Sequence, residues 1–553
     1  MDSRWLPASL LALRRYSAAT FGHDLIAGLT VGLVALPLAM AFAIASGLTP
    51  QAGIYCAIVT GFLISVLGGS RYQIGGPTGA FVVVVAGIVA EHGVSGLFMC
   101  TMMAGVILVI LGVTGAGSAV KYLPRPVVIG FTNGIAVLIA STQIKDFLGL
   151  RLDSMPAEFM ARMEAIGEHI ASASPAAVAL GIAALGIILL FRMFAPRVPG
   201  TIIALVACTV VVALSGIPVE TIGSRFGGIP SGLPEVHIPR FEMGLVPALL
   251  RPAFTVAMLG AIESLMSAVV ADRMAGDRHN PNVELIAQGA ANIASPIFGG
   301  LPATGAIART ATNIRSGART PMSGVIHALT LLLVLLVAAP LAGHIPMAVL
   351  AAILLVVSWN MGEWHEIPKL LKLTKTDISV WLVTFALTVF ADLTIAVEVG
   401  MILAAILFIR RVAATTTVSM VTPEYVESGR SHILQDKDIP PYVAIFRIHG
   451  PFLFGGTDKI ELITDRIDEL PSIVIVRLRN MTAIDATGVH ALEDLAARLR
   501  ASGRTLLLCG AREQPAAVMR DAELHLHVGE HNICLDIKAA LERAGQLHDR
   551  AAA

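Results

Sequence analysis

The stretch LPATGAIAR, residues 301–309, decides the fold, because it combines a proline, a glycine and a cation within a mostly apolar chain. A proline suits the first turn of a helix, and the free N–H groups of that turn attract negative charge. Arg309 adds a full positive charge near the same helix start. Alone, the stretch fits an anion-binding helix end and a Pro/Gly loop with a snorkelling arginine equally well.

A second copy of this pattern lies near the N-terminus, in GGPTGAF at residues 75–81. Its PTGA segment echoes the PATGA of residues 302–306, and a Gly-Gly pair precedes each copy, at 68–69 and at 299–300. Interrupted apolar segments at matching places in two halves are typical of the binding site of a repeat-built transporter. The echo therefore favours the anion site and predicts an internal duplication.

The composition is that of a polytopic membrane protein. Of 553 residues, 55% are hydrophobic and 14% are charged, and the mean hydropathy is +0.77. Such a chain has too little charge to cover a soluble surface, so we expect the lipid bilayer as its environment. Lys and Arg balance Asp and Glu at 39 each, which gives no case for nucleic acid. The five cysteines show no CxxC, so we expect neither disulfides nor a metal or cofactor.

Fourteen apolar segments follow one another along the first four hundred residues. They cover residues 25–46, 54–67, 77–90, 97–115, 127–142, 176–194, 201–214, 246–271, 285–298, 305–314, 322–340, 347–358, 378–390 and 393–409. Those starting at Pro77 and Gly305 are shorter than the roughly 20 residues that cross a bilayer, so we expect half-helices buried inside the protein. A split into seven plus seven spans near Val246 inverts the second repeat and makes the two half-helix N-termini face one another.

Charge between the segments predicts the orientation. With both termini inside, every internal connection is basic, as the positive-inside rule requires for a cell (inner) membrane protein with cytoplasmic termini. The basic residues concerned are Arg71, Lys121, Arg125, Arg192, Arg197, Arg273, Arg278, Arg315, Arg319, Lys369, Lys372, Lys375, Arg410 and Arg411. Residues 1–22 lack a cleavable signal peptide and form either an amphipathic interfacial helix or a frayed cytoplasmic tail.

The composition changes after Arg411. We predict a transmembrane domain over 23–412, a polar linker over 413–439, a soluble domain over 440–545 and a tail over 546–553. Strand patterns at 442–448, 473–478 and 505–509 alternate with helix patterns at 458–470, 488–500 and 532–544, which predicts a small α/β sheet. An even number of spans returns this domain to the cytoplasmic side.

Glu263 lies well inside an apolar segment, where an ionised carboxylate costs several kcal/mol unless it is paired or protonated. It is either a structural carboxylate or a group that loads and releases a proton as a cavity opens to each side. Ser267 lies one helical turn further and shares its face. Arg309 is either the charge partner of a substrate or the counter-ion of Glu263.

Other polar residues give weaker indications. Thr487, in DATG at 485–488, is either a phosphorylation site at a helix N-terminus or part of an ordinary N-cap, which we favour. Asp24 is interfacial by position. No ligand spacing is found among the histidines His23, His92, His279, His327, His344 and His365. No nucleophile–base constellation or P-loop is present, so we expect neither an enzyme nor an ATP-driven pump.

Four stretches together resemble the sulfate permease (SulP) family of anion transporters. They are residues 28–46 with LPLAMAFA at 36–43, the GPTGA run at 76–80, AIES at 261–264 and the stretch 302–319. The C-terminal domain is similar to a STAS domain. The resemblance implies fourteen segments in two inverted repeats, a core domain moving against a gate domain, and a homodimer with STAS domains beneath the membrane, with a possible cytoplasmic protein partner.

The resemblance also implies a substrate site between the two half-helices. Its matching positions here are Phe42, Thr78, Gly79, Ala80, Gly305, Ala306, Ile307, Ala308 and Arg309. Glu263 matches the acidic position that carries the proton in bacterial members, whereas sodium-coupled bicarbonate relatives have an aspartate there. Ala308 and Thr78 depart from the animal exchangers and motor protein, which argues against channel or motor behaviour.

These observations predict proton-coupled symport of a small anion by alternating access, with H+ favoured over Na+ as the coupling ion. The stretch 302–319 most resembles members that move C4-dicarboxylates such as fumarate and succinate, with sulfate as the other candidate. The alternatives are a sodium-coupled bicarbonate transporter, an anion exchanger or channel, and an anion sensor that signals through the STAS domain.

Overall fold

The computed structural model describes residues 5–13, 16–117, 124–152, 155–156, 158–195, 198–229, 232, 236, 242–391, 393–421 and 439–552. Lys121 and Arg197 of the predicted basic connections, and residues 422–438 of the predicted linker, lie outside these ranges. The chain forms two compact units, Met1–Met401 and Ile402–Ala553.

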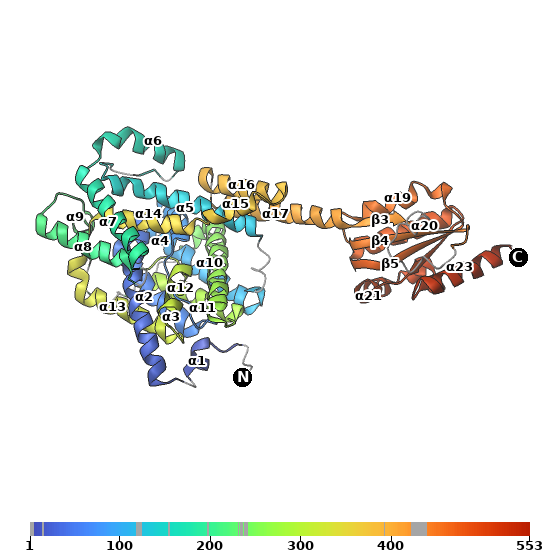
Figure 1. Ribbon diagram of the computed structural model, residues 1–553, viewed down its shortest axis with the longest axis horizontal. Helices are drawn as coiled ribbons and strands as arrows, with labels where there is room; N and C mark the ends of the chain where they lie inside the picture. The colour runs from blue at the N-terminus through green and yellow to red at the C-terminus, as the bar shows by residue number, and fades with distance from the viewer. Residues whose placement is uncertain are drawn as a thin grey trace. The chain divides into compact units, whose positions relative to one another are not determined.

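The first unit consists of apolar helices, and each of the fourteen predicted segments overlaps one of them (Figure 1). Eight described helices are long and apolar enough to cross a bilayer, and α8 is a shorter apolar helix. The first half contains α2 (Ala18–Ala45), α3 (Pro50–Leu67), α4 (Gly79–Val113), α5 (Arg125–Leu148), α7 (Pro175–Phe194) and α8 (Gly200–Ser215). The second half contains α10 (Val246–Ala275), α11 (Pro281–Ala294), α12 (Ile307–Arg315), α13 (Met322–Ala342), α14 (Met347–Met361) and α16 (Lys375–Phe390). The helix α17 (Leu393–Thr415) begins in this unit and ends in the second.

The helix α4 covers two predicted segments, which form two helical stretches joined by a kink. Gly93 adopts φ 68° and ψ −176° inside the helix, a conformation that glycine reaches at little cost. The helix direction therefore changes at Gly93, between the segments 77–90 and 97–115.

Helix packing follows the predicted inverted repeat. The contact of α2 with α13 corresponds to the contact of α10 with α4 in the other repeat. In the same way, the contact of α3 with α13 corresponds to the contact of α11 with α4. Likewise α5 packs against α16 as α14 packs against α7. These equivalent pairs divide the unit into one group with α2–α4 and α10–α13 and another with α5, α7, α8, α14 and α16.

Small residues allow the closest approach within the first group. A methyl group added at Gly105 of α4 would lie 2.8 Å from the Gly289 carbonyl oxygen, and one added at Gly289 of α11 would lie 2.6 Å from that of Gly105. Real side chains avoid such distances, so two facing glycines set the separation of α4 and α11. Close backbone contact of this kind is how membrane helices gain packing energy without a hydrophobic driving force.

Short helices connect the long ones: α1 (Ala8–Leu13), α6 (Phe159–His169), α9 (Ile222–Phe226) and α15 (Ile367–Leu370). The Ala8 N–H donates to the Gly68 carbonyl at 2.9 Å, which fixes α1 to the end of α3. Ala8 and Ser9 are buried, whereas Leu10, Leu11 and Leu13 are exposed. This division favours the amphipathic helix over the frayed tail.

Two buried carboxylates hold loops at the ends of the first group. Asp24 of α2 accepts hydrogen bonds from the Arg319 N–H at 2.7 Å and the Thr320 N–H at 3.1 Å. It is 0% exposed, so it lies inside the protein at the end of the helix group, and its interfacial depth stays a prediction. Glu284 of α11 is also 0% exposed and accepts from the backbone of Gly69 at 2.9 Å. Backbone N–H groups satisfy both carboxylates, which is what permits charges to be buried there.

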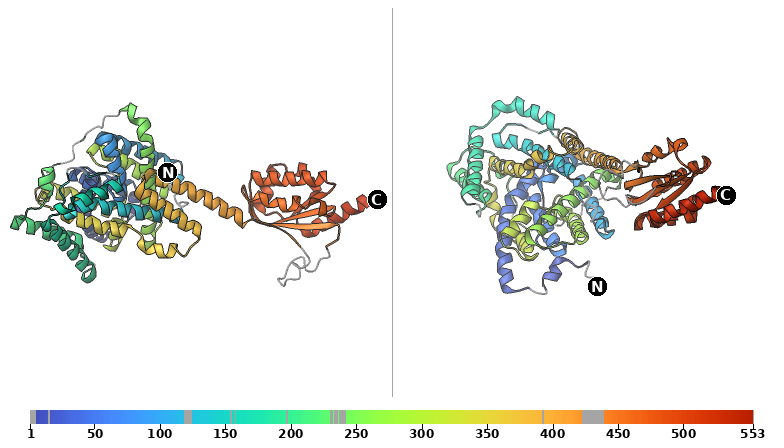
Figure 2. Two further views of the ribbon diagram at one scale, coloured as in Figure 1. Left: turned by 90° about the horizontal axis from the view of Figure 1, so that it is seen from above. Right: turned by 45° about the vertical axis from the view of Figure 1, so that its right-hand side comes forward.

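The second unit contains a five-stranded sheet in the order β3-β4-β5-β6-β7. The strands are β3 (Thr417–Met420), β4 (Val443–Phe452), β5 (Ile473–Ile484), β6 (Thr505–Cys509) and β7 (Ile533–Cys534), and only the β3–β4 pair is antiparallel. The helices are α19 (Glu461–Thr464), α20 (Ala486–Ala501), α21 (Glu513–Asp521), α22 (His525–Val528) and α23 (Ile537–Ala552). Separate apolar clusters join α20 and α23 to the sheet, which lies between helices in Figure 2.

The predicted α/β pattern is present with local differences. The predicted helix 458–470 is instead broken into short helical turns around α19, and α23 continues to Ala552. The strand β3 lies in the predicted linker, because its polar, mixed sequence does not alternate clearly enough to indicate an edge strand. The helices α21 and α22 were not predicted.

Candidate functional site

Two very short strands bring the starts of α4 and α12 together. The strand β1 (Gly75–Gly76) pairs antiparallel with β2 (Thr304–Gly305), and Gly75 lies opposite Gly305. The Ala306 N–H extends this pairing by donating to the Ile74 carbonyl at 2.8 Å. Because each half-helix begins directly after its strand, the two helix N-termini lie beside the same ladder.

Neither helix start is capped by its own N-cap side chain. The N-cap residue of α4 is Thr78 and that of α12 is Ala306, and neither makes a side-chain capping bond. An alanine offers no oxygen, and the Thr78 hydroxyl is used elsewhere. Among the described residues, neither N-cap side chain accepts from the first-turn N–H groups of these two adjacent helix ends, which is an arrangement suited to an anion.

Glu263 binds one of these ends. The Thr78 Oγ1 donates to Glu263 Oε2 at 2.9 Å, so the carboxylate of α10 lies at the N-cap of α4. Its side chain is partly exposed rather than sealed in the core. An ionised carboxylate in this position adds negative charge where the helix end favours it.

Arg309 extends from α12 to the loop before α4. Its Nη2 donates to the Pro77 carbonyl at 2.7 Å, whereas Nη1 has no hydrogen-bond partner among the described residues. The side chain is 2% exposed. No ion pair within 4.0 Å joins Arg309 to Glu263, both of which are described. A full positive charge is thus buried between the two helix ends with a carbonyl as its partner.

The other predicted residues surround these ends. Phe42 and Ala80 belong to one buried apolar cluster, Gly305 and Ala306 are buried, and Ile307 is half-buried. Ala308 is exposed, so the first turn of α12 is accessible from one side. A methyl group at Gly79 would lie 2.6 Å from Met361 Sδ of α14 and 3.0 Å from Ile139 Cδ1 of α5. The α4 end therefore lies where the two helix groups meet.

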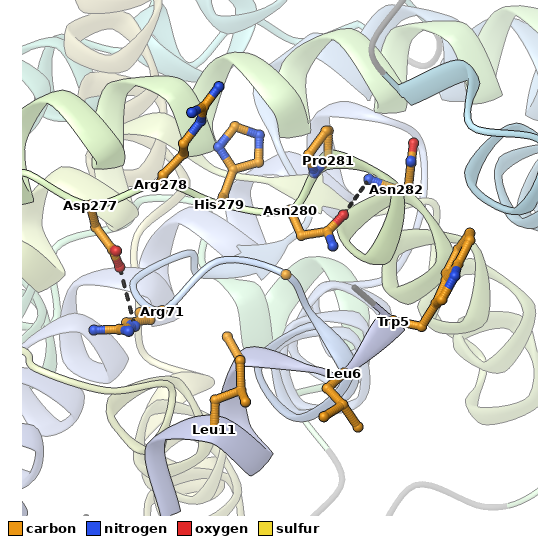
Figure 3. Close-up of a pocket in the computed structure, with 12 residues that line it drawn as sticks. Trp5, Leu6, Leu11, Arg71, Asp277, Arg278, His279, Asn280, Pro281 and Asn282 are labelled. Carbon is orange, nitrogen blue, oxygen red and sulfur yellow. Dashed lines mark hydrogen bonds and ion pairs between the residues drawn. The ribbon is translucent and has the colours of Figure 1, made fainter. Parts of the chain in front are cut away.

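A cavity of about 610 Å³ lies elsewhere in the first unit, among α1, the loop after α3 and the start of α11 (Figure 3). Two of the charged residues in its lining are paired, since Arg71 Nε lies 3.3 Å from Asp277 Oδ2. Asn280 caps α11 by accepting from the Asn282 N–H at 3.1 Å. This helix start is already satisfied, so the cavity lacks the free N–H groups found at α4 and α12.

Comparison with known proteins identifies the fold and the family. The model of the sulfate permease family matches residues 21–384, and that of the STAS domain matches residues 435–540. The chain belongs to the sulfate permease family. A putative sulfate transporter of Bacillus subtilis, YvdB, is 41% identical over 94% of this chain and 96% of its own length. The bicarbonate transporter BicA of Synechocystis is 32% identical over 94% of both chains.

Solved structures agree with this assignment. The structure of SLC26A9 superposes with a TM-score of 0.88 at 18% identity, covering 99% of this chain and 94% of that one. The transmembrane domain of a cyanobacterial BicA gives 0.61 at 34% identity, covering 70% of this chain and 98% of that one. The predicted fold class, a helical sulfate permease with a C-terminal STAS domain, is confirmed. The chain is a membrane anion transporter and not an enzyme, because its family consists of transporters.

The structure of this member of the sulfate permease family does not place the two threonines of the sequence echo at equivalent positions. The echo aligns Thr78 with Thr304, yet Thr78 is the N-cap of α4 whereas Thr304 lies in β2, before the N-cap Ala306 of α12. The Thr304 hydroxyl lies 2.6 Å from Ser264 Oγ and donates to the Gly260 carbonyl at 3.0 Å. It therefore ties β2 to α10 and is not at the helix end.

Ser267 also has a different neighbour from the one its spacing suggests. Its hydroxyl donates to Thr310 Oγ1 of α12 at 3.1 Å, and Thr310 accepts from the Ile74 N–H at 3.1 Å. Ser267 thus packs α10 against α12, and no hydrogen bond to Glu263 is among those of the described residues.

Sequence reasoning missed three residues that support the strands. Ser264 accepts from the Gly305 N–H at 3.1 Å, and Asn292 of α11 pairs with both backbone groups of Ala303, at 2.9 and 2.8 Å. Gln73 is buried against Gly305. For Ser264 and Asn292, a polar side chain inside an apolar helix was the available indication, because buried polar groups normally have a partner; Gln73 lies in the loop before β1, where no such indication exists.

In the STAS domain, Asp485 is the N-cap of α20. Its Oδ1 accepts from the Gly488 N–H at 2.9 Å and its Oδ2 from the Phe454 N–H at 3.0 Å. Thr487 is exposed in the first helical turn, and its phosphorylation stays a prediction. The cysteines are free, and the described residues contain no cluster of His, Cys, Asp and Glu fit for a metal ion.

Proposed function

We propose that this sulfate permease is a proton-coupled symporter of a small anion that works by alternating access. The observation that supports this proposal is the hydrogen bond from Thr78 to Glu263 at an otherwise uncapped helix end. It puts a carboxylate and a free helix N-terminus in one place, next to the loop that Arg309 holds.

The coupling follows from charge. The first-turn N–H groups of α4 and α12, together with Arg309, attract an anion. An ionised Glu263 opposes the anion at the same helix end, whereas a protonated Glu263 does not. Anion and proton therefore bind together, and neither charge need cross the membrane alone.

The substrate that we propose is a C4-dicarboxylate or sulfate. The putative sulfate transporter YvdB supports sulfate, and the bicarbonate transporter BicA makes bicarbonate the necessary comparison. Helix ends and one arginine recognise charge more than shape, so a transport assay must decide the anion. Sodium coupling would need more oxygen ligands than an isoleucine at position 307 can offer.

We further propose that the protein lies in the cell (inner) membrane as a homodimer with both termini in the cytoplasm. The basic residues of the predicted internal connections support this orientation. The STAS domain would then lie on the cytoplasmic side, where a protein partner can reach it.

The test is uptake by the purified full chain in liposomes. Fumarate, succinate, sulfate and bicarbonate are each offered under an imposed pH gradient or an imposed sodium gradient. One pH unit supplies about 1.4 kcal/mol per proton, so symport of the anion with one proton gives about tenfold accumulation when the membrane potential is held at zero. Sodium-driven accumulation of bicarbonate would contradict the proposal, and uptake that never exceeds equilibrium would indicate a channel.

Glu263→Gln tests the coupling residue. The variant should lose accumulation driven by an acid gradient and keep exchange of labelled for unlabelled anion, because a glutamine cannot release a proton. The exposed Glu91 supplies a matched control, since its side chain is 79% exposed and Glu91→Gln should transport normally. Undiminished proton-driven uptake by Glu263→Gln would overturn the coupling role.

A further inference from the structure

His327 is a buried polar side chain that the transport cycle described above does not use. It lies on α13 and is 0% exposed, and neither Nδ1 nor Nε2 has a hydrogen-bond partner among the described residues. Buried ring nitrogens normally have a partner, and a lone one is costly in an apolar interior. The residues around the imidazole ring therefore indicate which group His327 interacts with.

The imidazole faces α3 at a glycine. A methyl group added at Gly61 would lie 3.1 Å from His327 Cε1, 3.2 Å from its Nδ1 and 3.4 Å from the Gly75 carbonyl oxygen. The ring thus lies against the helix surface on which β1 also rests. A side chain at position 61 would therefore require the ring or the strand to shift by a few tenths of an ångström.

Arg309 approaches the same surface one turn away. The atom nearest to a methyl group added at Gly76 would be Arg309 Nη1, and Ala57 Cα of α3 would lie 3.7 Å from that methyl. Ala57 and Gly61 are four residues apart, about 6 Å along the helix. The free Nη1 and the free imidazole therefore face neighbouring turns across two of the smallest residues.

We propose that His327 is a positioning residue for Arg309, accepting the hydrogen bond of Nη1 through one buried water molecule. A guanidinium only donates, whereas a neutral imidazole has one nitrogen that accepts. A buried water needs two to four polar partners, and Nη1, the His327 ring and the Gly75 carbonyl supply three. With Nη2 on Pro77, both arms of the guanidinium are then held. The inference rests on the proposed anion role of Arg309.

The test measures the half-saturating anion concentration of exchange in liposomes, without any gradient, so it does not depend on proton coupling. His327→Leu keeps the approximate volume and removes the acceptor, and we expect a rise of about tenfold with little change in the maximal rate. His327→Gln restores an acceptor and should stay within about threefold of the parent. Thr330→Val on the same helix, which removes a hydroxyl bonded to the Ile326 carbonyl at 2.7 Å, is the matched control and should not change the half-saturation.

The possible outcomes distinguish a positioning role of His327 for Arg309 from a purely structural role. Normal half-saturation in His327→Leu, or equal losses in the Leu and Gln variants, would overturn the positioning role. If His327→Leu does not fold, Gly61→Ala displaces the ring and should raise half-saturation by a smaller factor; an unchanged value would equally overturn the inference. If Arg309→Gln itself keeps its affinity, the proposed anion site fails, which is a separate result.

Discussion

Three helix starts in this chain carry the pair Thr-Gly, and each uses its threonine differently. Thr78 is the N-cap of α4 and donates to Glu263. Thr304 lies in the strand before α12 and bonds to Ser264 of α10. Thr487 lies inside the first turn of α20, exposed to solvent. The same dipeptide thus marks three helix starts without fixing what any of them binds.

The difference lies in which group satisfies the first-turn N–H groups. At α20 the Asp485 carboxylate accepts from Gly488 of the helix and from Phe454 of a neighbouring loop. At α4 and α12 no N-cap side chain accepts, and Arg309 adds a buried charge instead. A capped start is satisfied by its own side chain, whereas the two uncapped starts leave N–H groups available for the anion that we propose.

Removing the charge of Arg309, which lies between the uncapped starts of α4 and α12, should have the largest effect on anion affinity. Leaving one partner of a buried charged interaction unpaired costs on the order of 3 kcal/mol, about a hundredfold in affinity. Arg309→Gln should therefore raise the half-saturating anion concentration of exchange about a hundredfold. The residue at the same helix position in α4 is Phe81, 1% exposed, and Phe81→Leu should leave that concentration within about threefold. Equal losses in the two variants would show that packing, and not charge, distinguishes the two ends.

Removing the Thr78 hydroxyl should have a smaller effect, which is a shift in the pH dependence of uptake. A hydrogen bond to a carboxylate favours its ionised form, so Thr78→Val should move the pH of half-maximal uptake upward. Losing about 1 kcal/mol of hydrogen bonding corresponds to a shift of roughly 0.7 pH units. Thr78→Ser keeps the hydroxyl and should behave like the parent. A downward shift in Thr78→Val would mean that Thr78 supports the protonated carboxyl instead.

The membrane fold could be predicted because its determinants are local in sequence. Apolar segments, their lengths and the charges between them are read directly, and the duplicated Thr-Gly-Ala pointed to the paired half-helices. The edge strand β3 could not be predicted, since four mixed residues carry no clear alternation and its partner β4 begins more than twenty residues later.

The site could be predicted only as far as residue type. Arg309 and Glu263 stand out as charges in apolar helices, but their partners lie far away in the chain: Pro77 is 232 positions from Arg309 and Thr78 is 185 from Glu263. Helical spacing suggested Ser267 as the neighbour of Glu263, because spacing indicates a shared face but not what that face meets. The adjacent Ser264 holds β2 instead, since the strand runs past that side of α10.

The smallest effect is expected at the capped start of α20, where a substitution should change local stability and leave anion binding unchanged. Asp485→Ala should destabilise the first turn of α20 by about 1 kcal/mol, which raises local opening about fivefold. Hydrogen exchange of the full-length protein should show this at the Gly488 amide, while anion exchange stays normal. Thr487→Val changes an exposed side chain in the same turn and should leave the amide protected. Loss of anion affinity in Asp485→Ala would contradict the view that a satisfied helix start has no part in anion binding. The three Thr-Gly helix starts would then differ only in position, and not in which group accepts the hydrogen bonds of their N–H groups.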